Sequence, residues 1–457
     1  EQAMMSFLGR AVYSYKKRYM AELSIRSDGS SVFGKDVRWG TFPSVGLGWA
    51  FSEEHFMKKL WWLSFGKIRA SWGKSGQKFQ EPYLALGIMS ESNVYNGSLG
   101  LIPQDMANPK LTWEESDQYD LGLDLQMLDY RLKLKLDYYY KYSSKLLMQS
   151  YLPGNVFLAS RMWDNASAIS NEGIEFEASY DVIRNKKWNW TVGFNLSHNR
   201  NMLRKTYNGE DLNDKVLGRP VYGIYTYKDE GIVQREEDIP MYRNATGKLM
   251  PLYFQSANNP LRVGGRKIKD QNYDGVIADK DLYYAGSTLP AAYGGINSHL
   301  EWNGFSLDLL FSYTLGRKVM NMVKNSAFSF TKEFGVVMNK FNIHDFWTTN
   351  NRNAKYPSLE FADKDYIGQF DGNVDSNIET ISFLRLKQLV LGYKFPQNWL
   401  KKTFIKEANL YLSGENLFLL TNYSGVDPEV IDPYTGKDDG REYPLNRKVT
   451  LGINLKF

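Results

Sequence analysis

The residues whose types and spacing best suit chemistry lie in one short acidic stretch between positions 270 and 281. Side-chain oxygens recur at every second position, a glycine follows them, and another carboxylate stands at the twelfth position; the residues concerned are Asp270, Asn272, Asp274, Gly275, Val276 and Asp281. Calcium loops wrap a Ca²⁺ ion with this spacing, and the ligand at position 7 is a backbone carbonyl, here that of Val276. We therefore expect Asp270, Asn272, Asp274, Val276 and Asp281 to hold a structural Ca²⁺ ion.

The same stretch has a second interpretation. Position 12 is Asp281, which is one methylene shorter than the usual Glu, so it reaches a bidentate contact less easily. Asx residues also form turns by hydrogen bonding to nearby backbone, without any metal. We expect the ion to order part of a loop at 199–291, because we expect that long segment to have little hydrophobic packing of its own.

The other candidates for catalysis are weak. The chain has no Cys, which excludes disulfides and thiolate nucleophiles, and its four His residues show no metal-ligand spacing. Glu175 and Glu177 could imitate the carboxylate pair of a glycosidase. Both lie in a strand-like segment, where they are better interpreted as facing a lumen. No Gly-x-Ser-x-Gly motif occurs, and we expect this protein not to be an enzyme.

Composition narrows the class of protein. The 457 residues carry a formal net charge of only +5, which gives no electrostatic footprint for nucleic acid. Mean hydropathy is low at −0.46, yet aromatic residues reach 15%. A membrane β-barrel reconciles the two values, because its strands alternate apolar and polar residues and its interfaces are rich in aromatics. Composition alone leaves a soluble β-sandwich or propeller equally open.

Hydrophobic period predicts an all-β chain. Between positions 449 and 457 apolar residues occupy every odd position, from Val449 to Phe457. One segment changes parity after Leu386, which predicts a β-bulge near Lys387 and Gln388. We count about 13 strands by this template, near 5–15, 18–27, 43–51, 65–75, 117–127, 130–142, 172–182, 187–198, 292–302, 304–315, 383–395, 406–416 and 447–457.

The connections between these strands alternate between short and long. The long segments are 28–42, 76–116, 143–171, 199–291, 316–382 and 417–446. Outer-membrane barrels have short periplasmic turns and long extracellular loops, whereas a soluble β fold has no reason to sort its loops. We therefore predict a transmembrane antiparallel β-barrel, with the odd residues of 449–457 facing outer-membrane lipid. An odd strand number cannot close alone, so we expect further strands outside this chain.

Several blocks spread over the chain resemble SusC/RagA-type TonB-linked outer-membrane transporters. In order along the chain they are Arg26-Ser27-Asp28-Gly29, Phe33-Gly34, Arg38-Trp39-Gly40, Phe42-Pro43, Asn108-Pro109, Trp113-Glu114, Asn171-Glu172-Gly173, Leu384-Arg385-Leu386-Lys387, Asn416-Leu417, Asp427-Pro428-Glu429 and Tyr443-Pro444. Each block is weak by itself, but together they are specific and cover essentially the whole chain.

The resemblance implies a 22-stranded barrel closed by an N-terminal plug, of which residues 1–457 would form the C-terminal barrel portion. It implies TonB-dependent import of oligosaccharides or peptides, with a SusD-like surface lipoprotein as lid and the TonB complex acting on the plug. We expect the signal peptide, the plug and the first strands to lie outside this chain. The alternatives are a siderophore or cobalamin receptor, a passive porin, and a soluble carbohydrate-active enzyme.

Aromatic residues have two interpretations. On strands, such as Trp188 and Trp190, they suit the girdles at the membrane interfaces. In loops, Tyr95, Tyr151 and Tyr253 could instead stack on sugar rings. The sequence does not choose between these roles for the loop residues.

Overall fold

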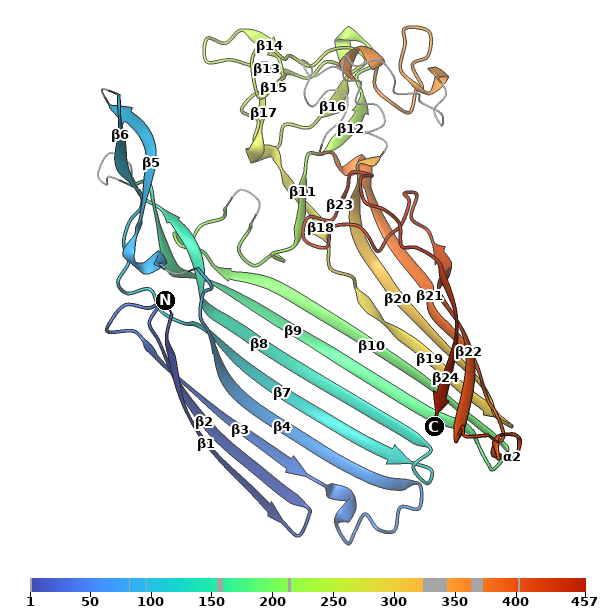
Figure 1. Ribbon diagram of the computed structural model, residues 1–457. Helices are drawn as coiled ribbons and strands as arrows, with labels where there is room; N and C mark the ends of the chain where they lie inside the picture. The colour runs from blue at the N-terminus through green and yellow to red at the C-terminus, as the bar shows by residue number, and fades with distance from the viewer. Residues whose placement is uncertain are drawn as a thin grey trace.

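The computed structural model describes residues 2–81, 83–95, 97–153, 159–212, 215–323, 343–362, 373–401 and 403–457. One curved antiparallel sheet dominates it, and thirteen strands follow one another in chain order across that sheet (Figure 1). They are β1 (Met4–Tyr15), β2 (Tyr19–Ser30), β3 (Trp39–Trp49), β4 (Leu63–Gln77), β7 (Glu114–Met127), β8 (Leu132–Tyr151), β9 (Arg161–Arg184), β10 (Trp188–Lys205), β19 (Ala292–Trp302), β20 (Phe305–Asn321), β21 (Ile378–Lys394), β22 (Glu407–Thr421) and β24 (Lys448–Lys456). Each predicted strand falls on one of these, so the all-β antiparallel prediction is confirmed.

The connections are sorted as predicted, with the short ones at one end of the sheet and the long ones at the other (Figure 1). The turn between β19 and β20 is Asn303-Gly304, and both residues have positive φ, 45° and 89°. Two-residue hairpins need this backbone because it matches the twist of the paired strands. We refer to this end of the sheet as the turn end and to the other as the loop end. The sheet is open, with β1 and β24 at the two ends of the strand order.

Strand pairing keeps apolar side chains on one face across the sheet. One row of directly paired residues consists of Trp49, Ile68, Leu123, Leu136, Phe176 and Leu196. The adjacent row consists of Lys67, Asp124, Lys135, Glu177 and Asn195, which lie on the opposite face. The bulge predicted near Lys387 is confirmed, because the β21–β22 register shifts between Leu386 and Gln388. Antiparallel pairing with this alternation gives the sheet one apolar face and one polar face.

Several strands run farther toward the loop end than predicted. β8 continues to Tyr151 rather than 142, and β9 begins at Arg161 rather than 172. Both strands are thus longer than the roughly 9–11 residues that a tilted strand needs to cross a bilayer. The apolar period fades in the extensions, and for that reason the sequence pattern stopped early.

The long segment after β10 is a folded unit, which corrects the expectation of little hydrophobic packing. Residues 223–287, together with 343–362 and 373–377, enclose a buried apolar core, and we call this unit the loop module. Its core consists of Tyr227, Leu252, Phe254, Leu261, Ile268, Ile277 and Val374. Apolar residues distant in sequence form this core, so no hydrophobic periodicity within the segment predicts it.

Smaller elements complete the fold. β5 (Ile88–Tyr95) and β6 (Ser98–Asp105) form a hairpin that projects at the loop end (Figure 1). The loop module contains β11 (Gly223–Thr226), β12 (Asp229–Ile232), β13 (Met241–Arg243), β14 (Leu249–Pro251), β15 (Tyr253–Phe254), β16 (Arg266–Ile268), β17 (Val276–Ile277) and β18 (Tyr283–Ser287). The others are β23 (Lys437–Asp438), which pairs with β20, α2 (Gln397–Leu400), and the 3-10 turns η1 (Phe51–Glu53), η2 (Leu84–Leu86), η3 (Glu236–Asp238), η4 (Asp279–Asp281), η5 (Ile343–Asp345), η6 (Leu359–Ala362) and η8 (Asp375–Asn377). Among the helices that the structure describes, none is long and apolar enough to cross a membrane.

Candidate functional site

The polar face of the sheet carries opposite charges in contact. Arg69 of β4 donates to Asp124 at 2.8 Å and to Asp137 at 2.8 Å, so one guanidinium joins β7 and β8. Lys135 and Glu177 lie 3.5 Å apart on the neighbouring strands. Glu177 is therefore part of a charged row on this face, as predicted for a lumen-facing residue. A face of this kind suits a hydrophilic solute passing along it.

At the loop end, an aromatic cluster packs between β3, the loop before it and the segment between β4 and β7. Phe33 stacks edge-on against Phe79 with ring centroids 5.0 Å apart and contacts Trp113 at 4.8 Å. Phe42 lies 5.7 Å from the same Trp113 ring. All four side chains are buried, at 9% exposure or less. The cluster holds the loops at 31–38 and 78–113 together over the sheet.

Contacts with the backbone join four of the family-like blocks in two pairs. A Cβ atom on Gly34 would lie 2.0 Å from the carbonyl oxygen of Pro109, so only glycine fits there. The indole Nε1 of Trp113 donates to the carbonyl of Arg38 at 3.0 Å. The side-chain amide of Asn108 donates to the Trp163 carbonyl at 2.9 Å. The structure thus brings together blocks about 75 positions apart, which the sequence analysis had noted only singly.

The contacts around Trp113 form one clamp on the loops, and a set of ion pairs forms a second clamp over β20–β22. Arg385 of β21 pairs with Asp427 at 2.5 Å and also with Glu429, and its side chain is only 3% exposed. Lys387 pairs with the other oxygen of Glu429 at 2.7 Å. The loop at 422–447 is therefore held down by buried charge pairs. Two further family-like blocks meet here, a pairing that the sequence analysis missed.

Arg317 reinforces this clamp without meeting a carboxylate. Its guanidinium donates to the backbone carbonyls of Thr288, Ile431 and Asp432 at 3.1–3.3 Å. Burying a cation requires such acceptors, because an unpaired buried charge is costly. No sequence signal marked Arg317, since its partners are main-chain atoms.

Within the loop module, Asp375 fastens the segment that leads into β21. This carboxylate accepts hydrogen bonds from Lys228 Nζ at 2.6 Å, from the Tyr283 hydroxyl at 2.7 Å and from the Asp229 backbone N–H at 2.9 Å. Burial alone would raise the pKa of Asp375, but these donors outweigh it, so the pKa lies below its usual value. Burial, together with the hydrogen bond to Asp375, raises the pKa of Tyr283 to about 12.

The predicted calcium residues lie in the loop module, where Asp270 and Asp281 are buried and Asn272 and Asp274 are exposed. Asp270 accepts the backbone N–H groups of Tyr273 and Gly275 at 2.7 and 2.9 Å. Asp281, which is fully buried, accepts those of Gln271 and Ala278, each at 2.8 Å. These contacts involve side-chain oxygens that the sequence assigned to an ion.

Two further predicted ligands bond to each other. The Asn272 amide donates to Asp274 at 2.9 Å, and the remaining Asp274 oxygen accepts the Val276 N–H. Gly275 has φ +89°, the positive value that the sharp turn needs. In the part of the chain that the structure describes, no group of three or more His, Asp or Glu side chains is arranged to hold a metal. An Asx-rich turn accounts for these contacts, and calcium binding stays a prediction.

The aromatic residues of the loops differ in how far their side chains are exposed. Tyr151 is 68% exposed, with the Tyr207 ring 6.1 Å away. Tyr253 is partly buried beside Tyr242, with centroids 6.1 Å apart. The side chain of Tyr95 lies outside the described part of the structure. Of the residues described, Tyr151 is thus the better placed to stack on a solute.

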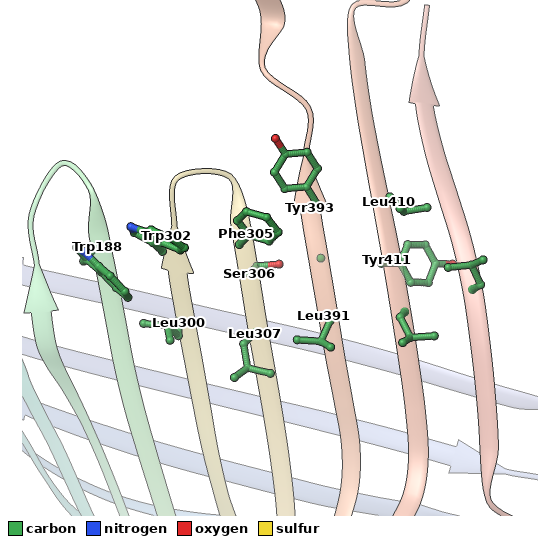
Figure 2. Close-up of a pocket in the computed structure, with 13 residues that line it drawn as sticks. Trp188, Leu300, Trp302, Phe305, Ser306, Leu307, Leu391, Tyr393, Leu410 and Tyr411 are labelled. Carbon is green, nitrogen blue, oxygen red and sulfur yellow. The ribbon is translucent and has the colours of Figure 1, made fainter. Parts of the chain in front are cut away.

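One apolar hollow does not belong to this polar site. It occupies about 490 Å³ on the apolar face near the turn end, and Figure 2 shows Trp188, Trp302 and Phe305 close to the turns, with Leu307 and Leu391 farther along the strands. The Trp188 and Trp302 rings stack 5.2 Å apart. This arrangement is consistent with the girdle interpretation of Trp188, because an apolar face bounded by aromatics suits lipid, and the interpretation stays a prediction.

Comparison with known proteins identifies relatives across the whole chain. Residues 6–417 match the family model described as "TonB dependent receptor-like, beta-barrel". TonB-dependent receptor P26 of Formosa agariphila is 32% identical over 99% of this chain and 46% of its own length. TonB-dependent receptor SusC of Bacteroides thetaiotaomicron is 28% identical over 99% of this chain and 44% of its own. The chain thus spans about half the length of the curated relatives it matches.

Solved structures agree on the fold. The RagAB peptide importer in its open-open state superimposes with a TM-score of 0.78 at 24% identity, covering 100% of this chain and 47% of that one. Another structure of the RagAB peptide transporter gives a TM-score of 0.76 over the same share of this chain. The resemblance to SusC/RagA-type transporters inferred from the sequence blocks is confirmed.

Proposed function

This chain belongs to the family of TonB-dependent receptor-like β-barrels and lies in the outer membrane, and from that premise we propose that it forms the wall of an importer of oligosaccharides or peptides. The family is one of transporters and receptors, not of enzymes. The relatives are about twice as long as this chain, so the proposal concerns the full-length protein that carries it.

The observation that carries the proposal is the architecture of the loop end. Buried clamps around Arg385 and Trp113 hold the extracellular loops, and the loop module has its own apolar core. A porin that passes small solutes needs no such ordered superstructure. Ordered loops above a charged, hydrogen-bonding face suit the capture of a large polar solute. The similarity to SusC, and to a RagAB structure described as a peptide importer, supports this solute class.

We propose that a SusD-like surface lipoprotein docks on the loop end and acts as its lid. The surfaces available for docking are the β5–β6 hairpin and the loop module, both of which rise above the sheet (Figure 1). Leu99 and Leu101 of the hairpin are 68% and 62% exposed. Co-purification of the full-length protein from outer membranes tests this partner. Recovery without any lipoprotein from gently solubilised membranes would contradict it.

Uptake in cells tests the transport proposal against the porin alternative. Cells producing the full-length protein should accumulate fluorescent oligosaccharides or peptides, and a TonB disruption should abolish the accumulation. Uptake that persists without TonB would identify a passive pore. Accumulation of ferric siderophore or cobalamin instead would identify the other class of TonB receptor.

A further inference from the structure

The apolar hollow near the turn end, which we call the groove, runs along the strands in the direction that a lipid acyl chain takes in a bilayer. Its residues come from β10, β19, β20, β21, β22 and β24. Figure 2 shows the aromatic residues at the end nearest the turns and leucines farther along the strands. The turn end of an outer-membrane barrel meets the periplasmic leaflet, because short connections lie on that side. The groove therefore runs from the headgroup level toward the middle of the bilayer.

A second, polar hollow of about 680 Å³ meets the groove at the turn end. Both are lined by Trp188, Trp302, Phe305 and Tyr393. Along their strands, Lys394 and Glu301 alternate with the groove residues Tyr393 and Trp302 and so lie on the opposite face, whereas Lys186 and Lys187 belong to the turn itself. An apolar groove bordered at its turn end by two lysines has the two-part chemistry of an anionic phospholipid.

The local sequence explains why the charge is placed there. Lys186 and Lys187 form the tight turn between β9 and β10, directly before Trp188. Lysine stems lie along apolar surface while their ammonium groups reach polar surroundings. Tryptophan prefers the same level, since its ring is apolar and its N–H is polar. The turn thus supplies cations at the depth at which lipid phosphates lie.

We propose that this groove binds an anionic phospholipid of the periplasmic leaflet. One acyl chain lies along Leu300, Leu307 and Leu391, and the phosphate meets Lys186 and Lys187. The site requires only the outer-membrane location of the chain and does not depend on what is transported. Phosphatidylglycerol satisfies both halves of the site, whereas the zwitterionic phosphatidylcholine offers the lysines no net charge.

Native mass spectrometry of the full-length protein in mild detergent tests the site, with phosphatidylglycerol and phosphatidylcholine of identical chains as probes. We expect the wild type to retain phosphatidylglycerol preferentially. Each lysine near a membrane surface contributes about 1 kcal/mol to anionic lipid binding, so K186Q/K187Q should weaken this binding about ten- to thirtyfold. K248Q/K267Q, which removes the same charge from the loop module, is the matched control and should leave it unchanged.

A groove variant tests the acyl-chain half separately. Leu391→Trp keeps the surface apolar but occupies the groove, and it should weaken phosphatidylglycerol binding while heat-modifiable gel mobility shows a folded barrel. Equal retention of both lipids by the wild type would overturn the proposal. So would unchanged binding in K186Q/K187Q or in L391W, or an equal loss in the K248Q/K267Q control.

Discussion

The sheet and the loop module reach stability by opposite routes. Large apolar side chains in the sheet point outward, as with Ile453 at 58% and Leu451 at 71% exposure. In the loop module Ile277 and Val374 are fully buried. The sheet is held by its backbone ladder and by the lipid around it, because unpaired N–H and C=O groups cannot be tolerated in hydrocarbon. The module is held by a core, as a water-soluble domain is.

The clamps at the loop end join these two kinds of structure. They belong to strands of the sheet, yet they depend on particular buried side chains such as Arg385 and Trp113. Sequence changes should therefore be tolerated on the lipid face provided that they stay apolar, but not in the module or the clamps. The following experiments test that contrast, beginning with the largest expected effect.

Removing the buried cation should have the largest effect. Arg385→Met leaves Asp427 without its buried partner and Glu429 with Lys387 alone, and breaking a buried pair from one side costs about 3–5 kcal/mol. We expect hydrogen exchange across 422–447 to accelerate strongly while exchange in β1–β9 is unchanged. R385K is the control, and it should retain more protection than R385M because it keeps a buried cation beside Asp427 and Glu429. Unchanged exchange in R385M would show that the clamp is dispensable.

The same substitution in both regions sharpens the comparison. Ile277→Ala creates a cavity in the module core and should cost about 2–5 kcal/mol. Ile453→Ala on the lipid face leaves no cavity, since lipid chains fill the space, and should cost clearly less. Hydrogen exchange of 223–287 measures the first effect and thermal unfolding in lipid measures both. Equal costs would mean that the two regions do not differ in how apolar residues stabilise them.

Calcium provides a test within the module. If the 270–281 segment binds Ca²⁺, added calcium should slow its exchange with a Kd of about 10⁻⁴–10⁻³ M, as in extracellular modules. Asp274→Asn removes a charge but keeps an acceptor for the Val276 N–H, so it should abolish the response and leave the metal-free turn intact. No response in the wild type would establish the segment as an Asx-rich turn.

Lowering the pH should have the smallest effect on stability, and it should act through Asp375. Its pKa is lower in the folded protein than in the unfolded chain, so its contribution to stability is present above the unfolded value of about 3.9 and is lost as pH falls through the folded value. Proteolysis at the junction of the loop module with β21 should therefore increase only below about pH 4. Asp375→Asn should remove this pH dependence. A transition near neutral pH would point to another group.

The local sequence pattern was sufficient to predict the strands that form the sheet. A strand alternates its two faces every residue, so the apolar run ending at Ile453 and Leu455 predicted both the strand and its lipid face. The parity change after Leu386 was enough to locate the bulge. Loop lengths were enough to predict that the short and the long connections lie at opposite ends of the sheet. These features depend on residues close together in the chain, and for this reason they could be inferred without a structure.

Contacts between distant segments were decided only by the tertiary structure. Gly34 is required by the Pro109 carbonyl and Arg385 by Asp427. The core around Ile277 also needs Val374, which lies nearly a hundred positions away in the chain. The family-like blocks marked several of these residues but not their partners. No spacing within one segment encodes such pairs, because the partners lie in separate segments that are brought together only in the folded structure.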